Sequence, residues 1–165
     1  MLVLVISDNH GVTGRMADVI SRVKPDLMVH LGDSQMSPGA LQAMAQCPVE
    51  LVAGNCDHSG GIPREKIIEI GGLRAFISHG DQYWVRSGPQ YIQSVARKKG
   101  CQLAMYGHTH IPLLEQSSDV VAFNPGSISV PRQGDGIGTY GLIEIDSRGQ
   151  AHYTLCRYYR VEKNW

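Results

Sequence analysis

Five short segments of the chain combine aspartate, histidine and asparagine with glycine. They are Asp8-Asn9-His10, Gly32-Asp33, Gly54-Asn55, His79-Gly80 and Gly107-His108-Thr109-His110. Carboxylate, amide and imidazole groups gathered in one cluster suit Mn²⁺, Fe²⁺ or Zn²⁺. Two such cations, about 3.5–4 Å apart, can activate a water molecule and neutralise charge on a phosphoryl group. The residue types therefore predict hydrolysis of a phosphate ester.

The spacing inside these segments lets pairs of side chains reach one ion. Asp8 and His10 are two residues apart, as are His108 and His110, and alternate residues of an extended chain point to the same side. Asp33 has two carboxylate oxygens and can bridge two ions. A single Gly-Asp or Gly-Asn pair is an ordinary turn signal. The ordered set of five segments, not any one of them, indicates a metal site.

Each segment follows an apolar run of strand length. We expect strands over residues 2–6, 27–31, 49–53, 73–78 and 103–106, and helices over 13–23 and 38–45. Thr13 and Ser37 are the expected N-caps, with Pro38 at the first helical position. The alternation of strands and helices in the first third predicts parallel strands with right-handed crossovers. Ligands of such sheets bind at the carboxyl ends of the strands, where these segments lie.

After the first third, the expected elements are mainly hairpins rather than alternating strands and helices. Hairpins are expected over 66–70 with 73–78, 111–116 with 120–123, and 140–146 with 150–157, and a helix over 89–99 that stops at Gly100. The last third is therefore expected to be largely antiparallel. No internal repeat, low-complexity segment or linker interrupts the chain. We expect a single α/β domain over residues 1–165.

Composition narrows the function classes. The 165 residues carry 15 basic and 15 acidic side chains, which excludes the strongly basic field of a general nucleic-acid binder; we expect no stable nucleic-acid binding. No apolar stretch approaches the ~20 residues of a membrane span, and the short run before Asp8 suits a buried strand better than a signal peptide. The four cysteines form no CxxC pair, as in a reduced, cytoplasmic protein.

The motifs together resemble the calcineurin-like metallophosphoesterase superfamily. Its small YfcE-type phosphodiesterases share, in the same order, Ser7-Asp8-x-His10-Gly11, Gly54-Asn55-Cys56-Asp57, Gly107-His108-Thr109-His110 and Asn124-Pro125-Gly126-Ser127. The resemblance covers essentially the whole chain. It implies a four-layer α/β/β/α sandwich of two mixed β-sheets, the metallo-dependent phosphatase fold. It also implies a phosphodiesterase in which a hydroxide bridging two divalent metals attacks the phosphorus atom of a small phosphate ester in line.

The resemblance assigns the metal ligands by position. Those of the first ion would be Asp8, His10, Asp33 and His110, and those of the second Asp33, Asn55, His79 and His108. Mn²⁺ is the foremost candidate, and Zn²⁺, Fe²⁺ and Ni²⁺ also suit the family. Three of these residues, Asp33, Asn55 and His108, would also act in catalysis. His30 and His152 lie inside apolar segments and are not expected to be ligands.

The proton donor for the leaving group is open. Many members of the superfamily place histidine directly after the metal-binding asparagine, where this chain has Cys56. A thiol is a poorer acid than imidazolium near neutral pH. His58 is a second possible donor. Either way, we expect esters with good leaving groups to react fastest.

The residue pattern leaves the exact activity and several surface roles open. The activity could be that of a phosphomonoesterase or nucleotidase, the fold could serve as a non-catalytic protein-binding scaffold, and the protein could form a homo-oligomer. Tyr83 and Trp84 could form an aromatic wall beside the site or pack in the core. Arg132 could contact a substrate phosphate or lie solvated on the surface. The segment from Asn124 to Ser127 could border the site or form a plain turn.

Overall fold

The computed structural model describes residues 1–58, 60–116 and 119–160. Its strands are β1 (Leu2–Ile6), β2 (Leu27–His30), β3 (Val49–Leu51), β4 (Glu65–Ile70), β5 (Leu73–Ser78), β6 (Leu103–Met105), β7 (Leu113–Glu115), β8 (Val121–Asn124), β9 (Thr139–Ile145) and β10 (Ala151–Arg157). Its α-helices are α1 (Gly14–Val23), α2 (Pro38–Ala45) and α3 (Gln90–Lys98), and two 3₁₀ turns, η1 (Asp81–Tyr83) and η2 (Val85–Ser87), precede α3. The predicted elements are confirmed, with ends that shift by one or two residues. The expectation of one domain over 1–165 includes residues 59, 117–118 and 161–165, which lie outside the described residues.

The first sheet has the strand order β10-β9-β1-β2-β3. β1 pairs with β2 in parallel, with Val5 opposite Val29, and β2 pairs with β3 in parallel. The predicted parallel unit is therefore confirmed. β9 pairs antiparallel with both β1 and β10; the β9–β10 pair is the hairpin predicted over 140–146 and 150–157.

The second sheet has the order β4-β5-β6-β8-β7. The predicted hairpins β4–β5 and β7–β8 are antiparallel, whereas β5–β6 and β6–β8 are parallel pairs. Both sheets are therefore mixed. The five metal-compatible segments are divided between them: three follow β1, β2 and β3, and two follow β5 and β6.

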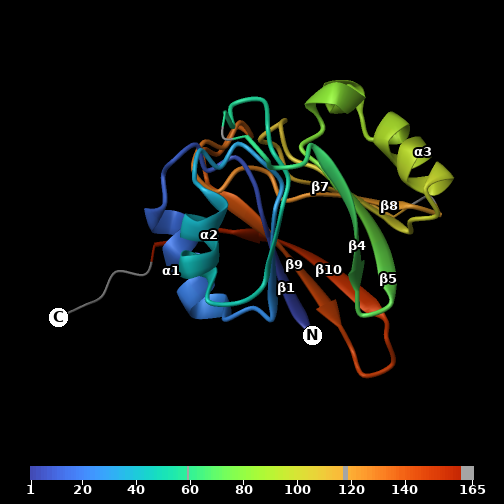
Figure 1. Ribbon diagram of the computed structural model, residues 1–165, viewed down its shortest axis with the longest axis horizontal. Helices are drawn as coiled ribbons and strands as arrows, with labels where there is room; N and C mark the ends of the chain where they lie inside the picture. The colour runs from blue at the N-terminus through green and yellow to red at the C-terminus, as the bar shows by residue number, and fades with distance from the viewer. Residues whose placement is uncertain (59, 117–118, 161–165) are drawn as a thin grey trace.

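Alternation along the strands explains the layers. Val3 and Val5 face the space between the sheets, in a cluster with Ile77 and Met105. Leu4 and Ile6 point the other way and pack in the cluster that α1 and α2 cover, while α3 covers the outer face of the second sheet. Figure 1 shows α1 and α2 on one side of the molecule and α3 on the other. A strand buried on both faces reads as a continuous apolar run. The predicted four-layer α/β/β/α sandwich is confirmed.

The helix ends follow the predicted capping residues only in part. The Ser37 hydroxyl accepts a hydrogen bond from the Ala40 N–H (3.2 Å), with Pro38 at the first position. Thr13 occupies the N-cap of α1 without a side-chain hydrogen bond. No helix in the described part of the chain is both long and apolar enough to cross a membrane.

Candidate metal centre

The seven predicted ligands lie together beyond the carboxyl ends of five strands. Asp8 and Asp33 are almost completely buried, as are His79 and His110. His10 and His108 are partly exposed and Asn55 is exposed, so the cluster opens to solvent on one side. The expectation that strand-end loops converge is confirmed.

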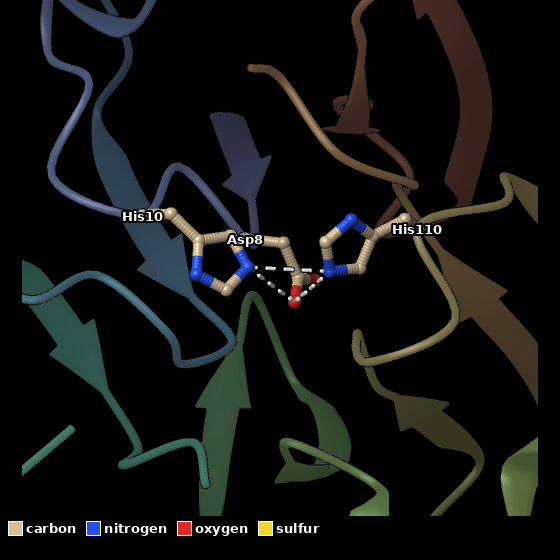
Figure 2. A group of neighbouring side chains, drawn as sticks. All are labelled: Asp8, His10 and His110. Carbon is tan, nitrogen blue, oxygen red and sulfur yellow. Dashed lines mark hydrogen bonds and ion pairs between the residues drawn. The ribbon is translucent and has the colours of Figure 1, made fainter. Parts of the chain in front are cut away.

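The first group joins the loop after β1 to the loop after β6. The Nε2 atom of His110 lies 3.1 Å from Oδ1 of Asp8 and 3.3 Å from Nε2 of His10. Figure 2 shows the two imidazole rings on opposite sides of the Asp8 carboxylate, each with one nitrogen directed toward it. One oxygen and two nitrogen atoms that converge in this way form a candidate ligand set for a transition-metal ion.

The second group is formed around the buried His79. The Nε2 atom of His79 is 3.5 Å from Oδ2 of Asp33 and 3.9 Å from Oδ1 of Asp8. The same Asp33 oxygen is 3.8 Å from Nε2 of His10. Asp33 therefore lies between the two groups and faces a histidine of each.

Asn55 and His108 lie at the open side of the second group. The His108 Nδ1 and Asn55 Oδ1 atoms are 3.1 Å apart, and the His108 ring contacts the His79 ring edge-on with centroids 5.2 Å apart. The backbone N–H of His108 also donates to Oδ2 of Asp8 (3.1 Å). These contacts connect the loops after β1, β3 and β6.

The backbone at the site differs from the predicted one. Five of the seven residues have positive φ angles: Asp8 (56°), His10 (45°), Asp33 (52°), His108 (65°) and His110 (61°). The extended conformation that we expected for the Asp-x-His and His-x-His pairs is therefore wrong. Asp8 and His10 approach each other through left-handed turns (Oδ1 to Nε2, 4.0 Å), whereas His110 joins the first group and His108 contacts His79 in the second. The left-handed conformation costs a non-glycine residue about 1–2 kcal/mol, and such outliers cluster at functional sites.

Hydrogen bonds between neighbouring loops maintain these turns. The N–H groups of Asp8 and His10 donate to the carbonyls of Gly32 (3.1 Å) and Asp33 (3.0 Å). Gly54 and Gly107 are required by close approach, since a Cβ atom there would lie 2.0 Å from Oδ1 of Asp33 and 2.0 Å from Oγ of Ser7, respectively. The glycines of the motifs thus let three loops pack around the carboxylates.

The donor atoms fit divalent metal ions. Nδ1 of His79 lies 2.7 Å from the Leu31 carbonyl oxygen and Nδ1 of His110 lies 2.6 Å from that of Val130. Each Nδ1–H therefore donates outward, which leaves the Nε2 lone pair directed into the site, as at metal-binding histidines generally. Oδ1 of Asp8 and Nε2 of His79 are buried without a hydrogen-bond partner. Unpaired buried polar atoms are costly, and bound cations would satisfy both.

The electrostatics of the site couple the carboxylates to the histidines. Burial raises the pKa of Asp8, but the neighbouring imidazoles of His110 and His79 outweigh it, so its pKa is lowered. Burial lowers the pKa of His79, yet the neighbouring Asp33 and Asp8 raise it overall. In the metal-free chain the site thus holds its carboxylates ionised, which is the state that binds cations.

Several buried polar residues brace the ligands, and sequence reasoning did not identify their roles. The Ser7 hydroxyl donates to Oδ2 of Asp8 (2.6 Å), and Nδ2 of Asn124 donates to the carbonyl of Gly107 (2.9 Å). The Ser127 hydroxyl donates to the Asp8 carbonyl (2.7 Å). The segment that follows β8 is therefore a buried brace, not a plain surface turn. The sequence signal that could have indicated this role is a polar residue, Asn124, at the end of an apolar strand.

A second brace connects the loops after β1, β2 and β3. His30 is fully buried, its Nε2 lies 2.9 Å from Oδ1 of Asn9, and burial lowers its pKa to about 4. Oδ1 of Asp57 accepts from the N–H of Gln35 (2.7 Å) and Oδ2 from that of Gly54 (2.8 Å). As expected, His30 lies outside the ligand cluster.

The two proposed proton donors differ in position. The Cys56 N–H donates to Oδ1 of Asp33 (2.7 Å), and burial together with Asp33 raises the pKa of the Cys56 thiol. His58 is exposed and has no hydrogen bond or ion pair with the described residues. Arg132 is exposed as well, and His152 pairs with Asp146 on the surface.

Comparison with known proteins identifies the family. The model of the calcineurin-like phosphoesterase superfamily domain matches residues 1–148. A probable metallophosphoesterase of Methanothermobacter thermautotrophicus is 34% identical over 142 residues, which cover 82% of this chain and 81% of that protein. The phosphodiesterase YfcE of Escherichia coli is 26% identical over 173 residues, which cover 88% and 89%.

A solved structure agrees with this result. The crystal structure of a predicted phosphoesterase from Streptococcus pneumoniae superposes with a TM-score of 0.78 at 25% identity, covering 95% of this chain and 97% of that one. The family is one of divalent-metal-dependent hydrolases, in agreement with the donor set described above. The chain belongs to the calcineurin-like phosphoesterase superfamily.

Proposed function

We propose that the protein is a phosphodiesterase that uses two divalent metal ions, Mn²⁺ foremost, to hydrolyse a small phosphate diester. The observation that carries this proposal is the position of Asp33. Its Oδ2 atom faces Nε2 of His10 at 3.8 Å and Nε2 of His79 at 3.5 Å. A carboxylate between two ligand groups is the arrangement that a pair of cations needs.

The residues divide the work between two ions. Asp8, His10, Asp33 and His110 would hold one, and Asp33, Asn55, His79 and His108 the other. Bound metal ions at this position would supply an activated water molecule and neutralise negative charge on the phosphoryl oxygens. The Nδ1–H bonds of His79 and His110 to backbone carbonyls keep both rings oriented for ligation.

Asn55 and His108 connect the centre to an open cleft, which both residues line. Their amide and imidazole groups can donate hydrogen bonds to phosphoryl oxygens. Cys56 borders the same position, and its raised pKa keeps the thiol protonated but weakly acidic near neutral pH. The chain therefore offers little help to a leaving group that needs a proton.

Two competing functions are outcomes of the test. A phosphomonoesterase or nucleotidase would use the same donors, and a protein-binding scaffold would need none of them. The buried, oriented lone pairs favour an enzyme over a scaffold. Whether the protein forms a homo-oligomer is a separate question, and its four free cysteines suit the reducing cytoplasm.

The test is hydrolysis of bis(4-nitrophenyl) phosphate and 4-nitrophenyl phosphate by metal-depleted protein, before and after addition of Mn²⁺. We expect turnover that depends on Mn²⁺ and is faster for the diester. Asp33→Asn keeps the shape of the side chain and serves as the blank. Turnover by Asp33→Asn at the wild-type rate, or faster hydrolysis of the monoester, would contradict the proposal.

A further inference from the structure

A cleft of about 390 Å³ opens beside Asn55 and His108, a size within the range of small-ligand sites. Its other walls come from the two 3₁₀ turns: Asp81, Trp84, Val85, Arg86 and Ser87. Because Asn55 and His108 are proposed metal ligands, the cleft is placed to receive a substituent of a phosphate ester bound at the metal centre. The walls therefore decide which substituent is accepted.

Trp84 is the largest group in the cleft and is not part of the core. Its side chain is 73% exposed, so the possibility that it packs in the core is wrong. The indole stacks on the Tyr91 ring, with centroids 5.5 Å apart and an angle of 28° between the rings. Tyr91 therefore supports one face of the indole.

The backbone around Trp84 is unusual for a residue of its size. Its φ angle is 51°, a conformation that is a genuine outlier for a bulky residue. The Tyr83 N–H donates to the Gly80 carbonyl (2.9 Å) and the Ser87 N–H to the Trp84 carbonyl (2.9 Å), which fixes the turn. Tyr83 also holds the turn in place, because its ring contacts Phe76 edge-on and its hydroxyl donates to Glu65. Strain at an exposed aromatic residue indicates a role in binding rather than in folding.

Arg86 supplies the net charge of the cleft. Asp81, the acidic residue of the wall, is paired with Arg64 (2.5 Å). Arg86 is exposed and has no hydrogen bond or ion pair with the described residues. It lines the same cleft as His108. An unpaired guanidinium beside a proposed phosphate site is suited to a phosphate oxygen.

Taking the proposed function as given, we propose that Trp84 and Arg86 determine the substrate class: a phosphate ester with a planar aromatic substituent, either an aryl group or a nucleobase. The aromatic ring stacks on the free face of Trp84, and Arg86 contacts the phosphate. Trp84 thus selects the substituent, whereas Arg86 binds the anion that every substrate shares.

The experiment measures inhibition of the Mn²⁺-loaded enzyme by three monophosphates. Adenosine 5′-monophosphate carries a base, phenyl phosphate carries an aryl ring, and ribose 5-phosphate carries neither. We expect Trp84→Ala to weaken the first two by about 5- to 150-fold, the range for one stacked base, and to leave ribose 5-phosphate unchanged. Trp84→Phe should restore part of the loss. Arg86→Ala should weaken all three equally.

The two aromatic inhibitors separate the sources of the ring: a Trp84→Ala loss confined to adenosine 5′-monophosphate assigns a nucleobase, and one confined to phenyl phosphate an aryl group. Tyr159→Ala, which removes another exposed aromatic side chain (60%), is the matched control. Equal losses for all three inhibitors in Trp84→Ala, or none for any, would overturn the assignment.

A binding measurement separates this inference from the proposed function. The chain has two tryptophans, so Trp165→Phe leaves Trp84 as the only indole. Adenosine 5′-monophosphate should quench its fluorescence saturably, and ribose 5-phosphate should not. Quenching without diester turnover would support aromatic binding at Trp84 and contradict the proposed phosphodiesterase activity. Diester turnover by the wild type without quenching by either aromatic phosphate would support the proposed activity and contradict aromatic binding at Trp84.

Discussion

Ser127 connects a buried brace to a proposed metal ligand. Its hydroxyl donates to the Asp8 carbonyl (2.7 Å) and accepts from the Val130 N–H (2.8 Å). The Val130 carbonyl in turn receives the Nδ1–H of His110 (2.6 Å). Removing one hydroxyl in Ser127→Ala therefore loosens the backbone of one ligand and the orientation of another, without changing any donor atom of the site.

The magnitude follows from burial. Ser127 and Asp8 are both 0% exposed, so the Asp8 carbonyl loses its side-chain partner out of reach of bulk water. An unsatisfied buried group costs about 1–3 kcal/mol of unfolding free energy. For a chain of this length that corresponds to a decrease in Tm of about 2–12 °C. Loss of a group that orients metal ligands typically reduces metal affinity by about 10- to 100-fold.

Chemical denaturation of the metal-free protein and Mn²⁺ titration by calorimetry measure the two effects separately. Ser129→Ala is the matched control, because its partly exposed hydroxyl donates to the Val12 carbonyl (3.3 Å) and both groups can bond to water. We expect the control to behave as the wild type. Wild-type stability and Mn²⁺ affinity in Ser127→Ala would refute the argument that this brace positions Asp8 and His110.

Three further predictions concern the metal, the proton and the turn that carries Trp84. Mn²⁺ at about 100 times its Kd should stabilise the wild type by about 2.7 kcal/mol and raise Tm by about 5–11 °C, whereas Asp33→Asn should show a clearly smaller shift in the same thermal scan. Because the thiol of Cys56 is a weak acid, hydrolysis rates of diesters should fall steeply as the pKa of the leaving group rises. Cys56→His should accelerate alkyl esters most. Equal gains for aryl and alkyl esters would argue against the missing acid. Burial and Glu65 raise the pKa of Tyr83 to about 12, above its ordinary value of 10, so this tyrosine stabilises the fold below pH 10 and the gain is lost as pH rises toward 12. Tyr83→Phe should make the decline in unfolding free energy between pH 10 and 12 shallower, and an unchanged slope would contradict the assignment.

Much of the fold follows from periodicity. The run from Leu2 to Ile6 is apolar on both faces because helices cover one side and the second sheet the other. The cap at Ser37 and the hairpin over 66–70 with 73–78 are local signals, and both are confirmed. The two-sheet architecture came from the family resemblance, because pairing between distant strands such as β1 and β9 leaves no trace in local sequence.

The site was predictable in its residue types and not in its geometry. Histidine and aspartate at strand ends marked the ligands, but the left-handed backbone at Asp8 and His110 depends on bonds to other loops. For the same reason, the sequence did not reveal the bracing hydrogen bonds of Ser127 and His30, because their partners lie far away in the chain. The exposure of Trp84 was also undecided, since an aromatic residue after a buried strand suits a core equally well.

The central claim is that loops from two sheets converge on Asp33 to hold a pair of cations. Electron paramagnetic resonance of the protein titrated with Mn²⁺ tests it most directly, because neighbouring Mn²⁺ ions give an exchange-coupled spectrum that an isolated ion does not. The account predicts about two ions per chain with coupling, and loss of that coupling in Asp33→Asn. A single uncoupled ion in the wild type, or none, would contradict it.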